Sequence, residues 1–154
     1  MIAGLFEGFK MTVRAIDVAD YILQKHGAMS AMKLQKLVYY SQAWHLVWED
    51  EELFSEEIQA WANGPVVPVL YKLHAGAFIL MAGFFNGDIS KILQASQDAI
   101  NRVLEFYGDK NSQWLSDLTH MEDPWKNARE GLAPGERGNK VISLASMSEY
   151  YSGI

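Results

Sequence analysis

The apolar residues of this chain recur mostly at helical spacing. Together with capping and helix-ending residues, the spacing predicts seven segments, at residues 12–26, 30–49, 66–74, 96–107, 112–119, 124–130 and 147–152. The segment at 30–49 has the strongest pattern, and Lys33 and Lys36 fall on the flanks of its apolar face. The expected N-terminal caps are Thr12, Ser30, Ser96, Ser112 and Ser146.

One segment follows the period of two that is typical of a strand. In residues 53–62, Phe54, Ile58 and Ala60 share one side, and Trp61 falls on the other. A turn at Gly64 should end this strand, and Pro65 should open the next helix. A second strand is expected at residues 89–93. The predicted class is therefore mainly α (α+β), with about six or seven helices and a small antiparallel β-hairpin or sheet.

The chain length suits one domain. Of the 154 residues, 1–12 differ in character from the rest and are expected to form an N-terminal tail, with a single domain at 13–154. The longest apolar run is residues 75–85, and its 11 residues are too few for a membrane span of about 20 residues. We expect this run to be buried or to meet a partner, and no membrane association.

Composition and charge limit which cellular compartment and which kinds of binding partner are expected. The sequence has no cysteine, which excludes disulfides and thiolate metal sites, and a cytoplasmic location is expected. The net charge of −6 disfavours nucleic acid, because a phosphate backbone would need a local basic patch. Lys33 and Lys36 are the densest basic cluster, so a nucleic-acid-binding regulator that uses their helix stays as an alternative.

Catalytic motifs are missing from the sequence. It contains no glycine-rich phosphate loop, no nucleophile elbow and no paired histidine motif. His120, with Glu122 and Asp123 close by, could hold a metal ion or move a proton, although a histidine is also common at a helix end. We therefore predict no enzyme and no cofactor, and keep an enzyme centred on His120, metal-dependent or acid–base, as the second alternative.

The aromatic residues separate into core and surface candidates. Trp44 and Trp48 are one helical turn apart and are expected to pack in the core. Trp61 faces away from Ile58 and Ala60 and is the best candidate for an exposed anchor, because large aromatic side chains dominate interface energies.

Three segments, taken together and in this order, resemble a known family. They are residues 33–44 (KLQKLVYYSQAW), residues 57–68 (EIQAWANGPVVP), and residues 115–120 (LSDLTH) followed by Pro124 and Trp125. The chain resembles the Panacea domain family, the SocA-like, prophage-associated group also called GepA. The resemblance covers about residues 13–150. Its motif residues, expected to be mostly structural, are Leu34, Gln35, Leu37, Tyr40, Gly64, Pro65, His120 and Trp125.

The resemblance implies a protein-binding function. Panacea domains look like antitoxins that neutralise a cognate toxin by direct contact between proteins, and SocA-like members act as adaptors that deliver a toxin to a Clp-type ATP-dependent protease. Such an antitoxin needs an interaction patch with a few buried anchors rather than chemistry. The candidate partner-binding residues are Trp61, Phe78, Phe84, Phe85, Lys33 and Lys36. An exposed run at 75–85 could equally be buried in a homodimer.

Overall fold

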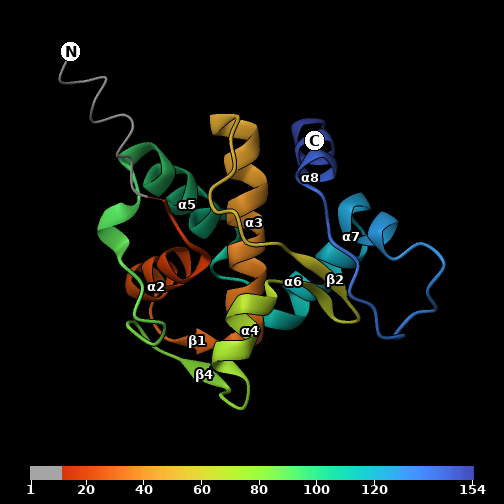
Figure 1. The fold of residues 1–154 in the computed structure, drawn as a ribbon, viewed down its shortest axis with the longest axis horizontal. Coiled ribbons are helices and arrows are strands. Elements are labelled where there is room, and N and C mark those ends of the chain that lie inside the picture. Colours follow the sequence, from red (N-terminus) through yellow and green to blue (C-terminus); the bar gives the residue numbers. More distant parts are fainter. Residues whose placement is uncertain (1–11) are drawn as a thin grey trace.

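The computed structural model describes residues 12–154, and in this part of the chain six α-helices surround the long helix α3 (Ala31–Glu49) (Figure 1). They are α2 (Ala15–His26), α4 (Pro68–His74), α5 (Gln94–Tyr107), α6 (Ser112–His120), α7 (Asp123–Ala128) and α8 (Leu144–Ser152). In Figure 1, α2 and α5 lie on one side of α3, and α6, α7 and α8 lie on the other. The predicted mainly α class is confirmed.

Two small antiparallel sheets complete the fold. β2 (Gln59–Trp61) and β3 (Gly64–Val66) form the hairpin predicted from residues 53–62, and Ala60 is buried between half-buried neighbours, as the alternation requires. β1 (Met29–Ser30) pairs with β4 (Ile79–Leu80). The strand predicted at residues 89–93 is wrong. Residues Ile89–Lys91 form a short 3-10 helix, η1, because the Asp88 side chain accepts the N–H of Ser90 at 3.0 Å and starts a turn there.

The helix starts were only partly predictable. Ser30 caps α3 as expected, and its hydroxyl accepts the Lys33 N–H at 3.2 Å. Thr12 does not cap α2, which begins at Ala15. Arg14 precedes the first residue of this helix, and its N–H donates to the Asp17 carboxylate at 2.8 Å.

Neighbouring residues also replace the other expected caps. Asn111 caps α6 and Ser143 caps α8, in place of Ser112 and Ser146. Helix α5 begins at Gln94, and the Ser96 hydroxyl lies 2.8 Å from Nε2 of His45 instead of capping it. Several polar residues near a helix start can each act as the cap, and the sequence alone does not choose between them.

Helix α3 is the centre of the core. Most of its residues are buried, including Leu34 and Leu37, because α2, α5, α6, α8 and the β2–β3 hairpin pack around it. Lys36 is 0% exposed, so the expectation that it lies on an open flank of the helix is wrong. A helix that is enclosed over most of its surface has only a small solvent face, so several of its polar residues lie inside the protein.

The expected tail at residues 1–12 falls, apart from Thr12, outside the described residues. Among residues 12–154, no helix has both the length and the apolar composition that crossing a membrane requires.

Candidate partner-binding surface and the buried motif residues

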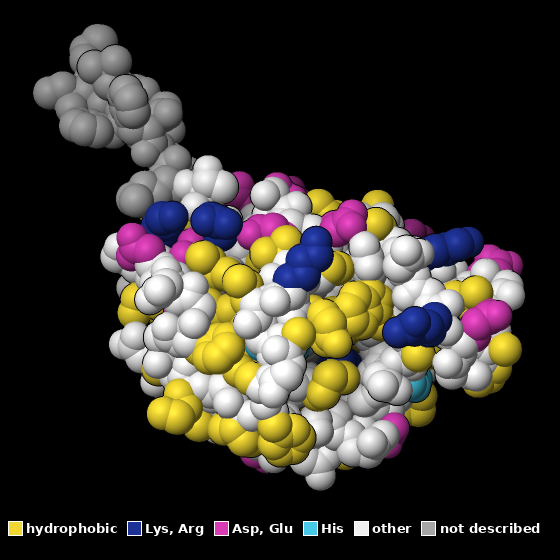
Figure 2. Space-filling model, turned by 60° about the horizontal axis from the view of Figure 1, so that its bottom comes forward, with side chains coloured by type: hydrophobic (Ala, Val, Ile, Leu, Met, Phe, Trp, Pro, Cys, Tyr) yellow, Lys and Arg dark blue, Asp and Glu magenta, His cyan; other side chains and the backbone are white. Residues whose placement is uncertain are grey.

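An exposed apolar surface covers helix α4 and the segment around β4. Its side chains, which we call the α4–β4 surface, are Val69, Tyr71, Leu73, Phe78, Ile79, Met81 and Phe84. Figure 2 looks onto the side of the molecule that carries α4 and β4, and apolar side chains are spread widely over this face. Phe78 is 76% exposed and Met81 is 64% exposed. Large exposed apolar side chains on neighbouring segments are typical of interaction sites.

The alternation of β4 explains why this segment is only half buried. Leu80 points into the core, so Ile79 and Met81 on either side of it point to solvent. Phe85 also turns inward and is only 6% exposed. The two carboxylate oxygens of Asp20 hold the chain here, accepting the N–H of Phe85 at 3.2 Å and of Gly87 at 2.7 Å. Phe85 is therefore a core residue, and its expected place on an exposed patch is wrong.

Trp61 lies at the border of the α4–β4 surface. It is half-buried, and its ring packs edge-on against Tyr71 with 4.9 Å between centroids. Its indole N–H donates to Gln59 at 2.9 Å, and its carbonyl oxygen accepts the Trp125 indole N–H at 2.8 Å. The hairpin thus places Trp61, half-buried, next to α4.

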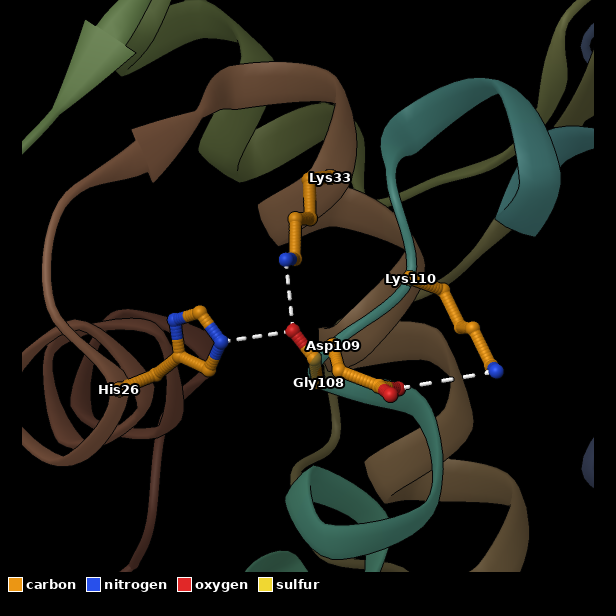
Figure 3. Close-up of polar contacts among 5 residues, drawn as sticks. All are labelled: His26, Lys33, Gly108, Asp109 and Lys110. Atoms are coloured by element: carbon orange, nitrogen blue, oxygen red, sulfur yellow. Dashed lines mark hydrogen bonds and ion pairs between the residues drawn. The ribbon is translucent and has the colours of Figure 1, made fainter.

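Lys33 has a partner inside the chain (Figure 3). Its Nζ donates to the Gly108 carbonyl at 2.6 Å, and Nε2 of His26 lies 2.6 Å from the same oxygen. Figure 3 shows the two side chains approaching this oxygen from α3 and from the end of α2. Burial lowers the pKa of Lys33. Lys33 therefore joins three helices at the C-terminal end of α5, where positive groups interact favourably with the helix dipole.

Lys36 passes into the protein beside Gly64. A side-chain carbon at Gly64 would lie 2.5 Å from Cε of Lys36 and 3.1 Å from Oγ1 of Thr119, and Gly64 has a φ of +123°. Only glycine suits this position, because both the backbone and the space exclude a side chain. Nζ of Lys36 is buried without a hydrogen-bond partner in the described structure, and burial lowers the pKa of its ammonium group to about 8.

Other motif residues fix the connection from the hairpin to α4. The Gln35 side chain accepts the Val67 N–H at 2.8 Å and donates to the Val67 carbonyl at 3.3 Å, directly before α4 begins. Its amide nitrogen also lies 3.0 Å from Nε2 of His74 at the other end of that helix. Pro65 lies in β3 opposite Ala60, so the prediction that it opens the helix is wrong, and α4 begins at Pro68. Gln35 thereby orients the helix that presents the apolar side chains.

The residues of the alternative His120 site do not converge on one another, and Nε2 of His120 is buried without a hydrogen-bond partner in the described structure. The His120 ring stacks on Trp125 at 4.0 Å, and burial lowers the pKa of His120. Glu122 is buried and accepts the hydroxyls of Tyr40 and Tyr151, each at 2.7 Å, whereas Asp123 is exposed. In the described part of the chain, no group of three or more His, Asp and Glu side chains is placed to hold a metal ion.

The nucleic-acid alternative loses its proposed surface as well. Lys36 is buried and Lys33 donates to a backbone carbonyl, so α3 does not present these two lysines as a basic face.

Sequence reasoning missed the contribution of α4. Tyr71 and Leu73 are exposed, while Leu70 and His74 of the same helix are buried. The available signal was a seven-residue helix with apolar residues on both faces, which leaves one face unpartnered.

Comparison with known proteins points to the same family as the motif residues do. The family model described as antitoxin SocA-like, Panacea domain, matches residues 34–126, which is more than half of the chain. A search of curated proteins and a search of solved structures each found no match. The matched range contains α4, β4 and the β2–β3 hairpin, together with Lys36, Gly64 and His120. The chain therefore belongs to the family of antitoxin SocA-like proteins with a Panacea domain.

Proposed function

We propose that this protein is an antitoxin that neutralises a cognate toxin by direct contact, and that the α4–β4 surface is the contact site. The observation that carries the proposal is the exposure of Phe78, Met81 and their neighbours on one face of an antitoxin-family domain. Exposed aromatic and methionine side chains are enriched in protein interfaces, where a few of them provide most of the binding energy.

The framework under this surface favours binding without large rearrangement. Gln35 holds both backbone groups of Val67 at the start of α4, and the Asp20 carboxylate holds the end of the β4 segment at Phe85. Because both ends of the surface are fixed by buried hydrogen bonds, little ordering entropy would be lost when a partner binds.

The charge of the chain supports a basic toxin. With a net charge of −6, the protein would attract a positively charged partner over distances of about 10 Å, which raises the association rate more than the affinity. Delivery of the bound toxin to a Clp-type protease is the second part of the proposal, and it rests on the resemblance to SocA-like members. It requires that the toxin be held while another surface meets the protease.

The test is co-expression with the product of the adjacent gene. The neighbour alone should stop growth, and this chain should restore growth and copurify with it. Rescue with a shortened toxin half-life would support delivery to a protease. A harmless neighbour, or rescue with neither a complex nor faster toxin turnover, would contradict the proposal.

Matched variants test the contact site. Phe78→Ser removes a side chain that is 76% exposed, and Phe106→Ser removes one that is 67% exposed on α5, away from α4 and β4. Loss of an aromatic anchor typically costs about 2 kcal/mol or more, so Phe78→Ser should weaken toxin binding at least ~30-fold. Phe106→Ser should leave binding unchanged. Equal effects of the two variants would refute the assignment of the surface.

A further inference from the structure

A cavity of about 800 Å³ lies where α3, α5 and α6 meet the C-terminal end of the chain. Its volume falls within the range of about 300–1,000 Å³ that is typical of small-molecule sites. The exposed side chains of Phe106 and Trp114 belong to its lining, so the cavity is open to solvent. Five of its eleven lining residues are aromatic, namely Trp44, Trp48, Phe106, Tyr107 and Trp114.

Among the described residues that line the cavity, Glu122 carries the one buried carboxyl group. Glu122 is 5% exposed, and its Oε1 accepts the hydroxyls of Tyr40 and Tyr151 at 2.7 Å each. Both donors are neutral. Within residues 12–154, no lysine, arginine or histidine forms an ion pair with this carboxylate. Burial raises the pKa of Glu122, as expected for an acidic group without a counter-charge.

The aromatic walls attract positive charge. The guanidinium carbon of Arg102 lies 3.9 Å from the centroid of the Trp48 ring, and Nζ of Lys110 lies 5.0 Å from that of Trp114. Cations bind favourably over such rings. The exposed lining residues Arg102 and Glu105 carry opposite formal charges that sum to zero. The uncompensated charge facing the cavity is therefore that of Glu122.

We propose that this cavity binds a small organic cation, in which a primary ammonium or guanidinium group is carried on an apolar body. The aromatic walls would enclose the apolar body, and Glu122 would receive the charged head. The two tyrosine hydroxyls hold its carboxylate in a fixed orientation. The assignment concerns this chain alone and does not depend on the proposed contact with a toxin.

Two-dimensional NMR with a matched pair of probes tests the assignment. 2-Phenylethylamine carries an ammonium group, and 2-phenylethanol has a neutral hydroxyl in its place. The amine should shift the indole N–H signals of Trp44, Trp48 and Trp114 in a saturable way, and should bind about tenfold more tightly than the alcohol. The indole signals of Trp61 and Trp125, which do not line the cavity, should stay unchanged.

Variants separate the contribution of the Glu122 charge to amine binding from that of the shape of the cavity. Glu122→Gln keeps an oxygen that can accept both tyrosine hydroxyls, so the variant should fold and should bind the amine and the alcohol equally. Glu149→Gln is the matched control, because Glu149 is exposed on α8 and does not line the cavity, and this variant should keep the preference. If Glu122→Gln does not fold, Trp114→Ala removes an exposed part of the wall and should weaken amine binding. Equal affinity of the unmodified protein for both probes, or no saturable shift, would overturn the assignment.

Discussion

Replacement of Lys36 by methionine is expected to stabilise the protein at neutral pH. Methionine has an unbranched side chain of similar length, so it can follow the same path past Gly64 without the terminal charge. Nζ of Lys36 has no hydrogen-bond partner in the described structure and is removed from water. An apolar group of similar shape avoids the cost of burying an unpaired polar atom.

The pKa gives the magnitude and the sign of this effect. Burial lowers the pKa of the Lys36 ammonium from 10.5 to about 8. Between these values the unfolded chain keeps the proton and the folded chain releases it, so the stability of the wild-type protein rises with pH through this range. Each unit by which the pKa is lowered corresponds to about 1.4 kcal/mol. The buried ammonium group of Lys36 therefore destabilises the folded protein by about 3 kcal/mol, and this destabilisation reaches its full size below pH 8.

Urea unfolding of the two proteins from about pH 7 to about pH 9.5 measures this difference. Lys36→Met should be more stable by about 3 kcal/mol at the lower pH, and its advantage should shrink as the pH rises. Lys72→Met on the exposed part of α4 is the control and should show no such trend. A Lys36→Met variant that is less stable than the wild type at neutral pH would refute the reasoning, because it would show that the ammonium group has a stabilising partner.

Three further substitutions test the packing around the motif residues by urea unfolding. Gly64→Ala should lower the free energy of unfolding by about 3 kcal/mol or more. Gly83 also has a positive φ but has open space around it, so Gly83→Ala should lower it by only about 1 kcal/mol. Equal losses in the two variants would exclude the close contact between Gly64 and Lys36. Lys33→Met should cost about 1–2 kcal/mol, because a charged donor to the Gly108 carbonyl is lost, and an unchanged stability would mean that this bond contributes nothing. Phe85→Ala should cost about 3 kcal/mol or more and Phe84→Ala less than about 1 kcal/mol, and the reverse order would place the wrong residue in the core.

The sequence predicts the helices well where an apolar face and a cap coincide. Ser30 and the apolar residues of 30–49 define α3 without ambiguity, and the alternation of Ile58, Ala60 and Trp61 defines the first strand of the hairpin. At residues 89–93, by contrast, the side chain of Asp88 forms a local turn that competes with strand pairing. Local periodicity carries no information about that competition.

The candidate site was predictable only in part, because exposure depends on tertiary packing. The apolar run at 75–85 indicates either burial or contact with a partner, and the structure divides it between the two, with Phe78 exposed and Leu80 buried. Lys36 looks like a flanking residue in the sequence, but the hairpin and α6 cover it. The aromatic cavity was missed for the same reason. Trp44 and Trp48 have the spacing of core residues, yet they are half-buried and line an open cavity beside α5.

Hydrogen–deuterium exchange of the free protein and of its complex with the toxin would test the proposed contact site most directly. We predict slower exchange in the complex for the backbone amides of α4 and of residues 78–84. Peptides from α5 and α8, which lie away from the α4–β4 surface, should exchange at the same rate in both states. Protection confined to other elements, with unchanged exchange in α4 and residues 78–84, would contradict the assignment of this surface to toxin binding.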